Sequence, residues 1–212
     1  MSEASQTTPA ADEVSRPKPI SLPDAQRLKL AARNHGLALL AAITLWAAAD
    51  AWAMTSGLNL ATGLSLLNAF AAMTIIATIF HEWGHFAGAR IAKSYSPMVT
   101  NPTGAFIFGF NFAKNTRQQF LAMSIGGPVG NWLLITLVFL FVPLDNPGRV
   151  MLLAVAVARG ISVLIFELPI ILRVMNGGDP ETELNVGQDN GSGDRGQVIG
   201  YAAGVLLWIL AV

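Results

Sequence analysis

Long apolar runs, separated by short polar stretches, constrain this chain more than any other feature of its sequence. A helix needs about 20 mostly apolar residues to cross a lipid bilayer. About five runs reach that length, at residues 36–54, 60–86, 119–143, 150–172 and 195–212. Hydrophobic residues make up 53% of the chain and charged residues 12%, a balance that a soluble domain would find hard to keep off its surface. The sequence therefore predicts an all-α polytopic membrane protein with about five transmembrane helices.

The stretch before the first run is polar. Residues 1–34 are rich in proline and have little apolar periodicity, which predicts a disordered tail that leads into a short interfacial helix. The basic residues of this tail are Arg16, Lys18, Arg27, Lys29 and Arg33. By the positive-inside rule, they place the N-terminus in the cytoplasm. We therefore expect a cytoplasmic tail over residues 1–34 and a membrane-embedded domain over residues 35–212, in a plasma or inner cell membrane.

The second run ends in His81-Glu82-Trp83-Gly84-His85, which has the pattern H-E-x-x-H. On a helix, His81 and His85 lie on one face and can bind one metal ion, while Glu82 lies beside them and can act as a general base. The chain has no cysteine, so histidine and carboxylate must hold the metal. The pattern predicts a zinc protease with Glu82 as its catalytic base, at the cytoplasmic end of the second span.

A third metal ligand is needed, because catalytic zinc normally has three protein ligands and one open position. The candidate carboxylates, from the end of the fourth run onward, are Glu167, Asp179, Glu181, Glu183, Asp189 and Asp194. Asp194 stands out because it follows a glycine-rich turn and begins the last apolar run. Its alternative role is to cap that helix. Most of the other carboxylates fit ordinary loop charges.

The segment between the second and third runs has a strand-like pattern. Phenylalanine recurs at Phe106, Phe108, Phe110 and Phe112, after a turn at Asn101-Pro102-Thr103-Gly104. Strict alternation predicts a small membrane-associated β-hairpin with one aromatic face. Such a hairpin could hold an unwound substrate segment, so Phe106, Phe108 and Phe110 are candidate substrate-binding residues. A hairpin that lies on the membrane with its phenylalanines in lipid fits the same pattern.

The third run opens with small residues, from Ser124 to Gly130, followed by Asn131. Glycines in an apolar run indicate close packing against a neighbouring helix. An amide in such a run needs a hydrogen-bond partner, so Asn131 is a candidate for binding the substrate backbone or the metal site, and a neighbouring helix is the other possible partner.

Three features together resemble the site-2 protease family of intramembrane zinc metalloproteases. They are the H-E-x-x-H pattern at the end of a transmembrane run, the sequence Gly127-Pro128-Val129-Gly130-Asn131, similar to the family's glycine-proline-x-x-asparagine helix, and a late aspartate that begins a helix. The resemblance covers roughly residues 60–212. Glu167-Leu168-Pro169 resembles the part upstream of the family's aspartate, with Glu in place of the usual Asn. The family's spacing favours Asp179 as the third ligand, whereas a rigid helix start favours Asp194, which we prefer.

The resemblance implies an enzyme that binds Zn²⁺ through His81, His85 and Asp194 and cleaves transmembrane segments of membrane-tethered regulatory proteins. Its partners would be a transmembrane protein substrate and the lipid bilayer, and the zero net charge gives no indication of nucleic-acid binding. Two other classes stay open. A proteolytically inactive relative could bind membrane helices as an adaptor or chaperone and keep a structural zinc. A metal-handling or haem-binding membrane protein could use the histidine pair alone.

Overall fold

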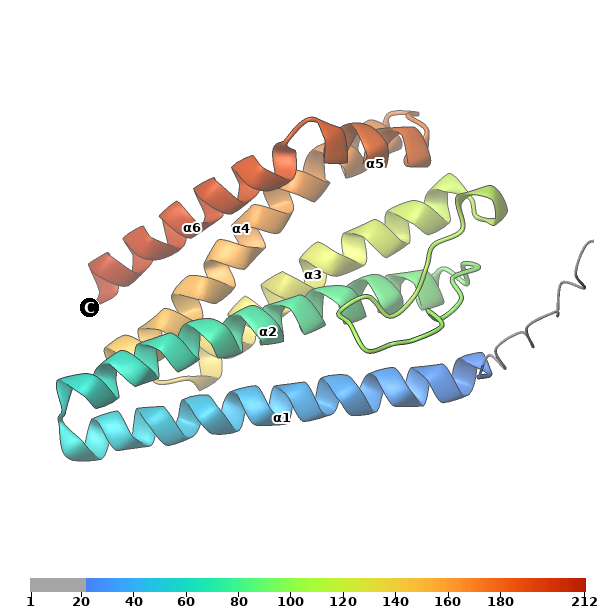
Figure 1. Cartoon of the computed structure of the whole chain (residues 1–212). Coiled ribbons are helices and arrows are strands. Elements are labelled where there is room, and N and C mark those ends of the chain that lie inside the picture. Colours follow the sequence, from blue (N-terminus) through green and yellow to red (C-terminus); the bar gives the residue numbers. More distant parts are fainter. Residues whose placement is uncertain (1–21) are drawn as a thin grey trace, which may run out of the picture.

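Six α-helices contain most of the residues, 22–212, that the computed structural model describes. They are α1 (Asp24–Ser56), α2 (Asn59–Ile91), α3 (Arg117–Phe141), α4 (Pro147–Met175), α5 (Pro180–Asp189) and α6 (Ser192–Ala211), with a short 3-10 helix, η1 (Phe112–Lys114), before α3. Helix α2 packs against α1, α3 and α4, and α4 also packs against α3 and α6, whereas the short α5 lies at one end of the bundle (Figure 1). Helices α2 and α4 therefore form the centre of the fold.

Four of these helices, α1 to α4, are long and apolar enough to cross a membrane. Helices α1 and α2 have 33 residues each, or about 50 Å at 1.5 Å per residue, so each exceeds the roughly 30 Å of a hydrocarbon core. Helix α6 corresponds to the fifth predicted run, but it is not one of the four candidate spans. Its first turns contain Asp194, Arg195 and Gln197, which shorten its apolar part. The described residues therefore form a multi-pass membrane protein with four candidate spans, and the count of five is not confirmed.

Helix α1 begins inside the stretch that was expected to be a disordered tail. Residues 1–21 lie outside the described residues, but residues 24–34 are helical. This part of α1 has tertiary contacts, because Ala31 is buried in a cluster with Phe86 and Ile107, and Arg27 Nη1 donates a hydrogen bond to Met98 O over 2.8 Å. The short interfacial helix expected at the end of the tail is thus the first part of α1, continuous with the first span, and these contacts stabilise it.

The segment between α2 and α3 pairs with itself, but it contains no strand among the described residues, so the predicted β-hairpin is not confirmed. One antiparallel bridge joins Met98 to Phe108, and Val99 N donates to Ile107 O over 3.0 Å. Within the alternating stretch, Ile107 is fully buried, whereas Phe106 is 73% exposed. Ile107 packs toward α1 and α2, and Phe108 packs against Phe86 beside the same cluster.

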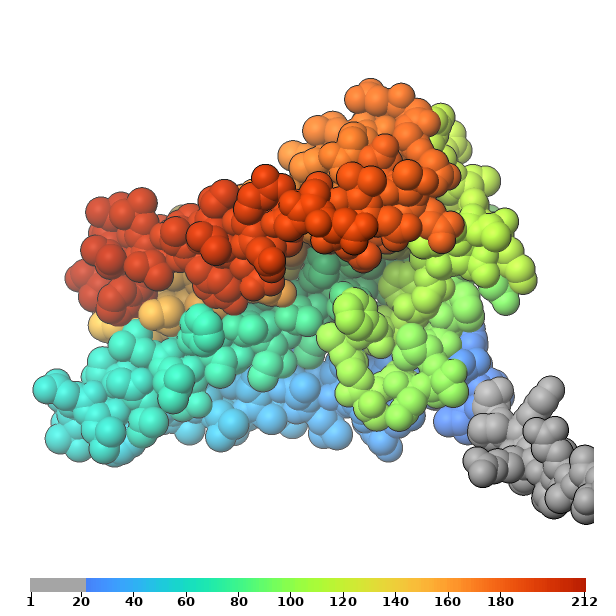
Figure 2. All heavy atoms as spheres, turned by 45° about the horizontal axis from the view of Figure 1, so that its top comes forward, coloured from blue at the N-terminus to red at the C-terminus, as the bar shows by residue number. Residues whose placement is uncertain are grey.

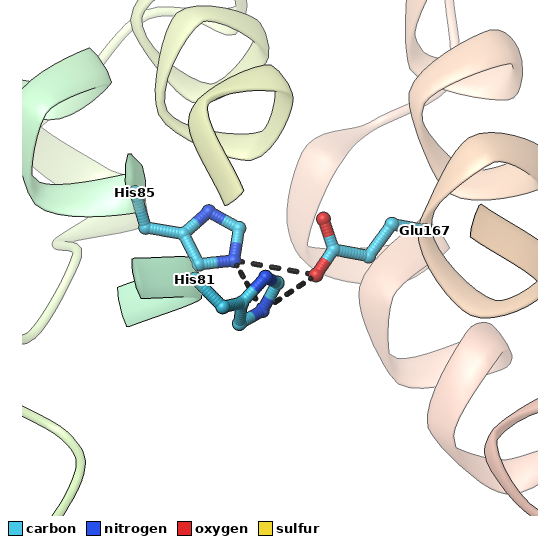
Figure 3. Close-up of side chains that lie close together, drawn as sticks. All are labelled: His81, His85 and Glu167. Atoms are coloured by element: carbon cyan, nitrogen blue, oxygen red, sulfur yellow. Dashed lines mark hydrogen bonds and ion pairs between the residues drawn. The ribbon is translucent and has the colours of Figure 1, made fainter. Parts of the chain in front are cut away.

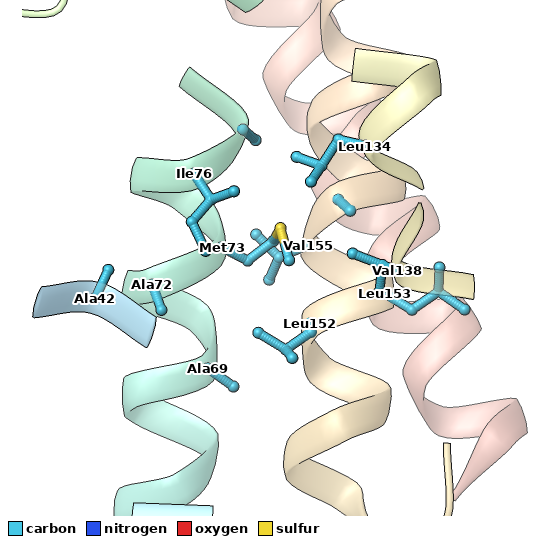
Figure 4. Close-up of a cluster of buried hydrophobic side chains, with 12 residues drawn as sticks. Ala42, Ala69, Ala72, Met73, Ile76, Leu134, Val138, Leu152, Leu153 and Val155 are labelled. Carbon is cyan, nitrogen blue, oxygen red and sulfur yellow. The ribbon is translucent and has the colours of Figure 1, made fainter. Parts of the chain in front are cut away.

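The main core lies between α1, α2, α3 and α4 (Figure 4). Alanines on α1 and α2, such as Ala42, Ala69 and Ala72, let these helices approach closely, while larger side chains from α3 (Leu134, Val138) and from α4 (Leu152, Val155) fill the centre of the cluster. Lipid is as apolar as these side chains, so close van der Waals packing stabilises the bundle more than the hydrophobic effect does. This core fixes the relative positions of α2, α3 and α4, which supply the candidate site.

Candidate metal centre

Helix α2 presents both histidines of the H-E-x-x-H pattern toward α4. His81 and His85 are one turn apart, so their imidazoles lie on one face with ring centroids 4.3 Å apart;. The Nε2 atoms of the two rings are 3.0 Å apart. Both ligand atoms therefore point at one place, as the sequence predicts.

A carboxylate from α4 completes the group (Figure 3). Glu167 Oε1 lies 3.1 Å from His81 Nε2 and 3.2 Å from His85 Nε2. Ligands at about 2.0–2.1 Å from a tetrahedral zinc ion are about 3.3 Å apart, so the edges of this triangle are close to those of a tetrahedral site. Two histidines and one glutamate are also a known ligand set of catalytic zinc. The donor set and its dimensions fit a metal ion of this kind.

Hydrogen bonds to the outer nitrogens orient both rings. His85 Nδ1 lies 2.8 Å from Met123 O, and because a carbonyl oxygen can only accept, Nδ1 carries a proton and Nε2 is the atom that faces Glu167. The amide of buried Asn131 lies 3.3 Å from His81 Nδ1. Asn131 therefore contacts the site through His81.

Helix α3 approaches the histidines so closely that only glycine fits. A Cβ atom on Gly127 would lie 2.4 Å from His85 Nε2 and 2.6 Å from His81 Cε1. A Cβ atom on Gly84 of α2 would lie 2.2 Å from Gly126 O on α3. The small residues at the start of the third run therefore pack against α2, as predicted, and Gly127 also forms a wall of the site.

The metal group lines a cavity of about 750 Å³, together with Glu82 of α2. Its lining includes Phe106, Phe108 and Phe110 from the segment before α3, and Gln188 and Gln197 from α5 and α6. Figure 2 shows that side of the molecule, where α5 and α6 face the light green segment before α3. The aromatic side of the segment that buries Ile107 thus faces the metal group.

Glu82 is buried, with 8% of its surface exposed. Its carboxylate accepts no hydrogen bond from the residues that the structure describes, although it lines the cavity beside the histidines. A carboxylate without a partner beside a metal group is available to take a proton from a molecule in the cavity. The position of Glu82 agrees with the role that the sequence predicts.

The two aspartates considered as third ligands lie outside the metal group. Asp194 is exposed in the first turn of α6. Asp179 caps α5, and the hydrogen bond from Thr182 N to its carboxylate, 2.9 Å long, holds the pKa of Asp179 below its usual value. Glu167 takes the place that we expected for Asp194. The signal that could have identified it is a carboxylate within an apolar run, where an unpaired charge is costly.

No family model, curated protein or solved structure matches the chain.

Proposed function

We propose that this protein is an intramembrane zinc metalloprotease that cleaves transmembrane segments of other membrane proteins. The observation that carries the proposal is the group of His81, His85 and Glu167, within 3.0–3.2 Å of one another, beside the unpaired carboxylate of Glu82 in a cavity. All four residues lie in helices that are long and apolar enough to span a membrane.

Two features favour a catalytic zinc over a structural one. Structural zinc usually has four protein ligands and no open position, whereas catalytic zinc has three, and the described residues bring three together here. The ligands also line a cavity that is large enough for a segment of substrate. A structural site would need neither this cavity nor a general base.

The residues of the chain divide the chemistry of hydrolysis among them. His81, His85 and Glu167 would hold a zinc ion, which as a Lewis acid would supply polarisation of a peptide carbonyl and a lower pKa for water. Glu82 takes the proton of the attacking water and then gives it to the leaving amine. Met123 O and Asn131 hold the imidazoles in position, so that Nε2 of each ring faces the centre.

The substrate must be at least partly unwound to react. A helical transmembrane segment hides its peptide bonds in its own hydrogen bonds, and these groups must be satisfied elsewhere once the helix opens in a membrane. The cavity offers apolar surface from Phe106, Phe108 and Phe110 on the side opposite α4 and α6. We propose that these phenylalanines bind side chains of the unwound segment.

The test is cleavage of a tagged single-span membrane protein, reconstituted with this chain, alongside measurement of zinc content. We expect the wild type to cleave and Glu82→Gln to be inactive with unchanged zinc content, because the change removes the base and keeps every ligand. Glu181→Gln, which removes an exposed carboxylate on α5, is the matched control and should cleave normally. Equal cleavage by Glu82→Gln and wild type would refute the role of Glu82. Zinc in both without cleavage in either would favour an inactive helix-binding relative.

A further inference from the structure

Arg159 lines the same cavity as the metal group, but nothing in the proposed mechanism uses it. It lies on α4, eight residues before Glu167 (167 − 159 = 8) and well inside a candidate membrane span. Among the described residues, its guanidinium takes part in no salt bridge and no hydrogen bond. A cation in this place needs an explanation, because ionisable residues within membrane spans are costly and usually pair with a partner or line a pathway.

The cavity itself does not supply the missing partner. Among the described residues, the acidic ones that line it are Glu82 and Glu167, and neither lies within 4.0 Å of Arg159, the limit for a salt bridge. Glu167 is held by the two histidines. The remaining polar lining residues are neutral, such as Ser162, whose hydroxyl donates to Ala158 O over 2.8 Å. The guanidinium therefore lines a cavity in which no carboxylate of the described residues lies within salt-bridge distance of it.

The distance along α4 places Arg159 within reach of a bound substrate segment. Eight residues of helix correspond to about 12 Å at 1.5 Å per residue. An extended chain rises about 3.3 Å per residue, so the same distance corresponds to about three or four residues of unwound substrate. A substrate whose scissile bond lies at the metal group would thus pass Arg159 about three or four residues away.

We propose that Arg159 binds the carboxylate of an Asp or Glu in the substrate, about three or four residues from the scissile bond, and so sets which bond is cleaved. This inference rests on the proposed function and names the feature of the substrate that the site selects. A guanidinium forms bidentate, charge-assisted hydrogen bonds with a carboxylate, which are stronger in surroundings of low dielectric constant than in water. An apolar segment with one acidic residue could then be held in a single register.

The test is a series of single-span substrates in which one Glu is moved one residue at a time along the segment, with Gln at the same position as the paired control. The proteins are reconstituted in phosphatidylcholine vesicles, which carry no net charge, so no anionic lipid competes for Arg159. The cleaved bond is identified by mass spectrometry. We expect the cleaved bond to move with the Glu at a fixed offset, and kcat/KM to fall about tenfold to hundredfold for each Gln partner, as for the loss of one charge-assisted hydrogen bond.

Two variants test the role of Arg159 itself. Arg159→Met should remove the preference for Glu over Gln, while Arg159→Lys, which keeps the charge, should retain part of it. Arg117→Met removes an exposed arginine at the start of α3 and is the matched control. A cleaved bond that stays in place as the Glu moves, or a Glu preference that survives in Arg159→Met, would overturn the inference even if the protein is a protease.

Binding of the same substrates to Glu82→Gln gives a readout that does not depend on cleavage. We expect Glu82→Gln to bind the Glu substrates more tightly than their Gln partners, and this difference to disappear when Arg159→Met is added. That result without cleavage by the wild type would support the role of Arg159 and refute the protease. Cleavage by the wild type with equal binding of Glu and Gln substrates would support the protease and refute the role of Arg159.

Discussion

Gly127→Ala should lower the zinc affinity of the proposed site without unfolding the protein. The added methyl carbon would lie 2.4 Å from both Nε2 and Cε1 of His85, and ordinary van der Waals contact begins near 3.4 Å. The imidazole must therefore move by about 1 Å, whereas a metal site tolerates about 0.2 Å in its ligand distances. Changes in the residues that merely orient a ligand lower metal affinity by about 10–100-fold. Displacing the ligand itself should cost at least this much, or about 1.4–2.7 kcal/mol of binding free energy.

The assay is zinc affinity by competition with a chelating dye, measured together with the unfolding temperature in detergent. Gly130→Ala is the informative control, because its methyl would lie 2.5 Å from Phe80 O. That contact is with main chain, so it should separate α2 from α3 and lower the unfolding temperature. Gly63→Ala, whose methyl meets nothing within 4 Å, should change neither quantity. Wild-type zinc affinity in a stably folded Gly127→Ala protein would refute the assignment of the histidines as ligands.

Three further changes test other parts of the structure. Glu167→Gln should lower zinc affinity by more than the roughly 100-fold expected for a residue that only orients a ligand, whereas Asp194→Asn should leave zinc affinity unchanged. The reverse result in the dye competition would favour Asp194 as the ligand. Asn131→Leu should lower zinc affinity about 10–100-fold, because it removes the group beside His81 Nδ1, and unchanged affinity would show that Asn131 serves packing alone. Asp50→Ala should lower the free energy of unfolding by about 3 kcal/mol, the low end for breaking a buried ion pair, since buried Asp50 accepts a 2.9 Å bond from the partly exposed Arg149 Nε. Denaturant unfolding in detergent measures this, and a change below about 0.5 kcal/mol would contradict it.

The helices could be predicted because hydrophobic length is a direct requirement of the bilayer. The four candidate spans found in the structure coincide with four of the predicted runs. The segment before α3 could be predicted less well, because alternation indicates two faces but not which face is buried. Ile107 fills the space beside Phe86 and Met98, and this choice depends on the shape of α1 and α2 rather than on local sequence.

The third ligand shows a different limit of reasoning from sequence. We preferred Asp194 because a helix start is rigid, and that argument concerns how well a ligand is held, not where it lies. The position of Glu167 opposite His81 and His85 depends on the packing of α2 against α4, which no local pattern contains. The cost of a carboxylate within an apolar run was nevertheless visible in the sequence. Only Glu167 among these three residues carries that cost, which indicates that it needs a partner. Asp179 and Asp194 lie exposed at helix starts, where an acidic residue needs no special partner.

The close packing of α2 against α3 and the chemistry of the site depend on the same glycines. A Cβ atom on Gly88 would lie 2.1 Å from Ala122 O, as near to main chain as the one on Gly84. Only backbones this close bring Met123 O within 2.8 Å of His85 Nδ1. A larger residue at Gly88 would have to move α3 away by about 1 Å, which lengthens that bond beyond the range of a hydrogen bond. Packing and function are therefore compatible roles for these glycines, because the orientation of His85 depends on the close packing of α2 against α3.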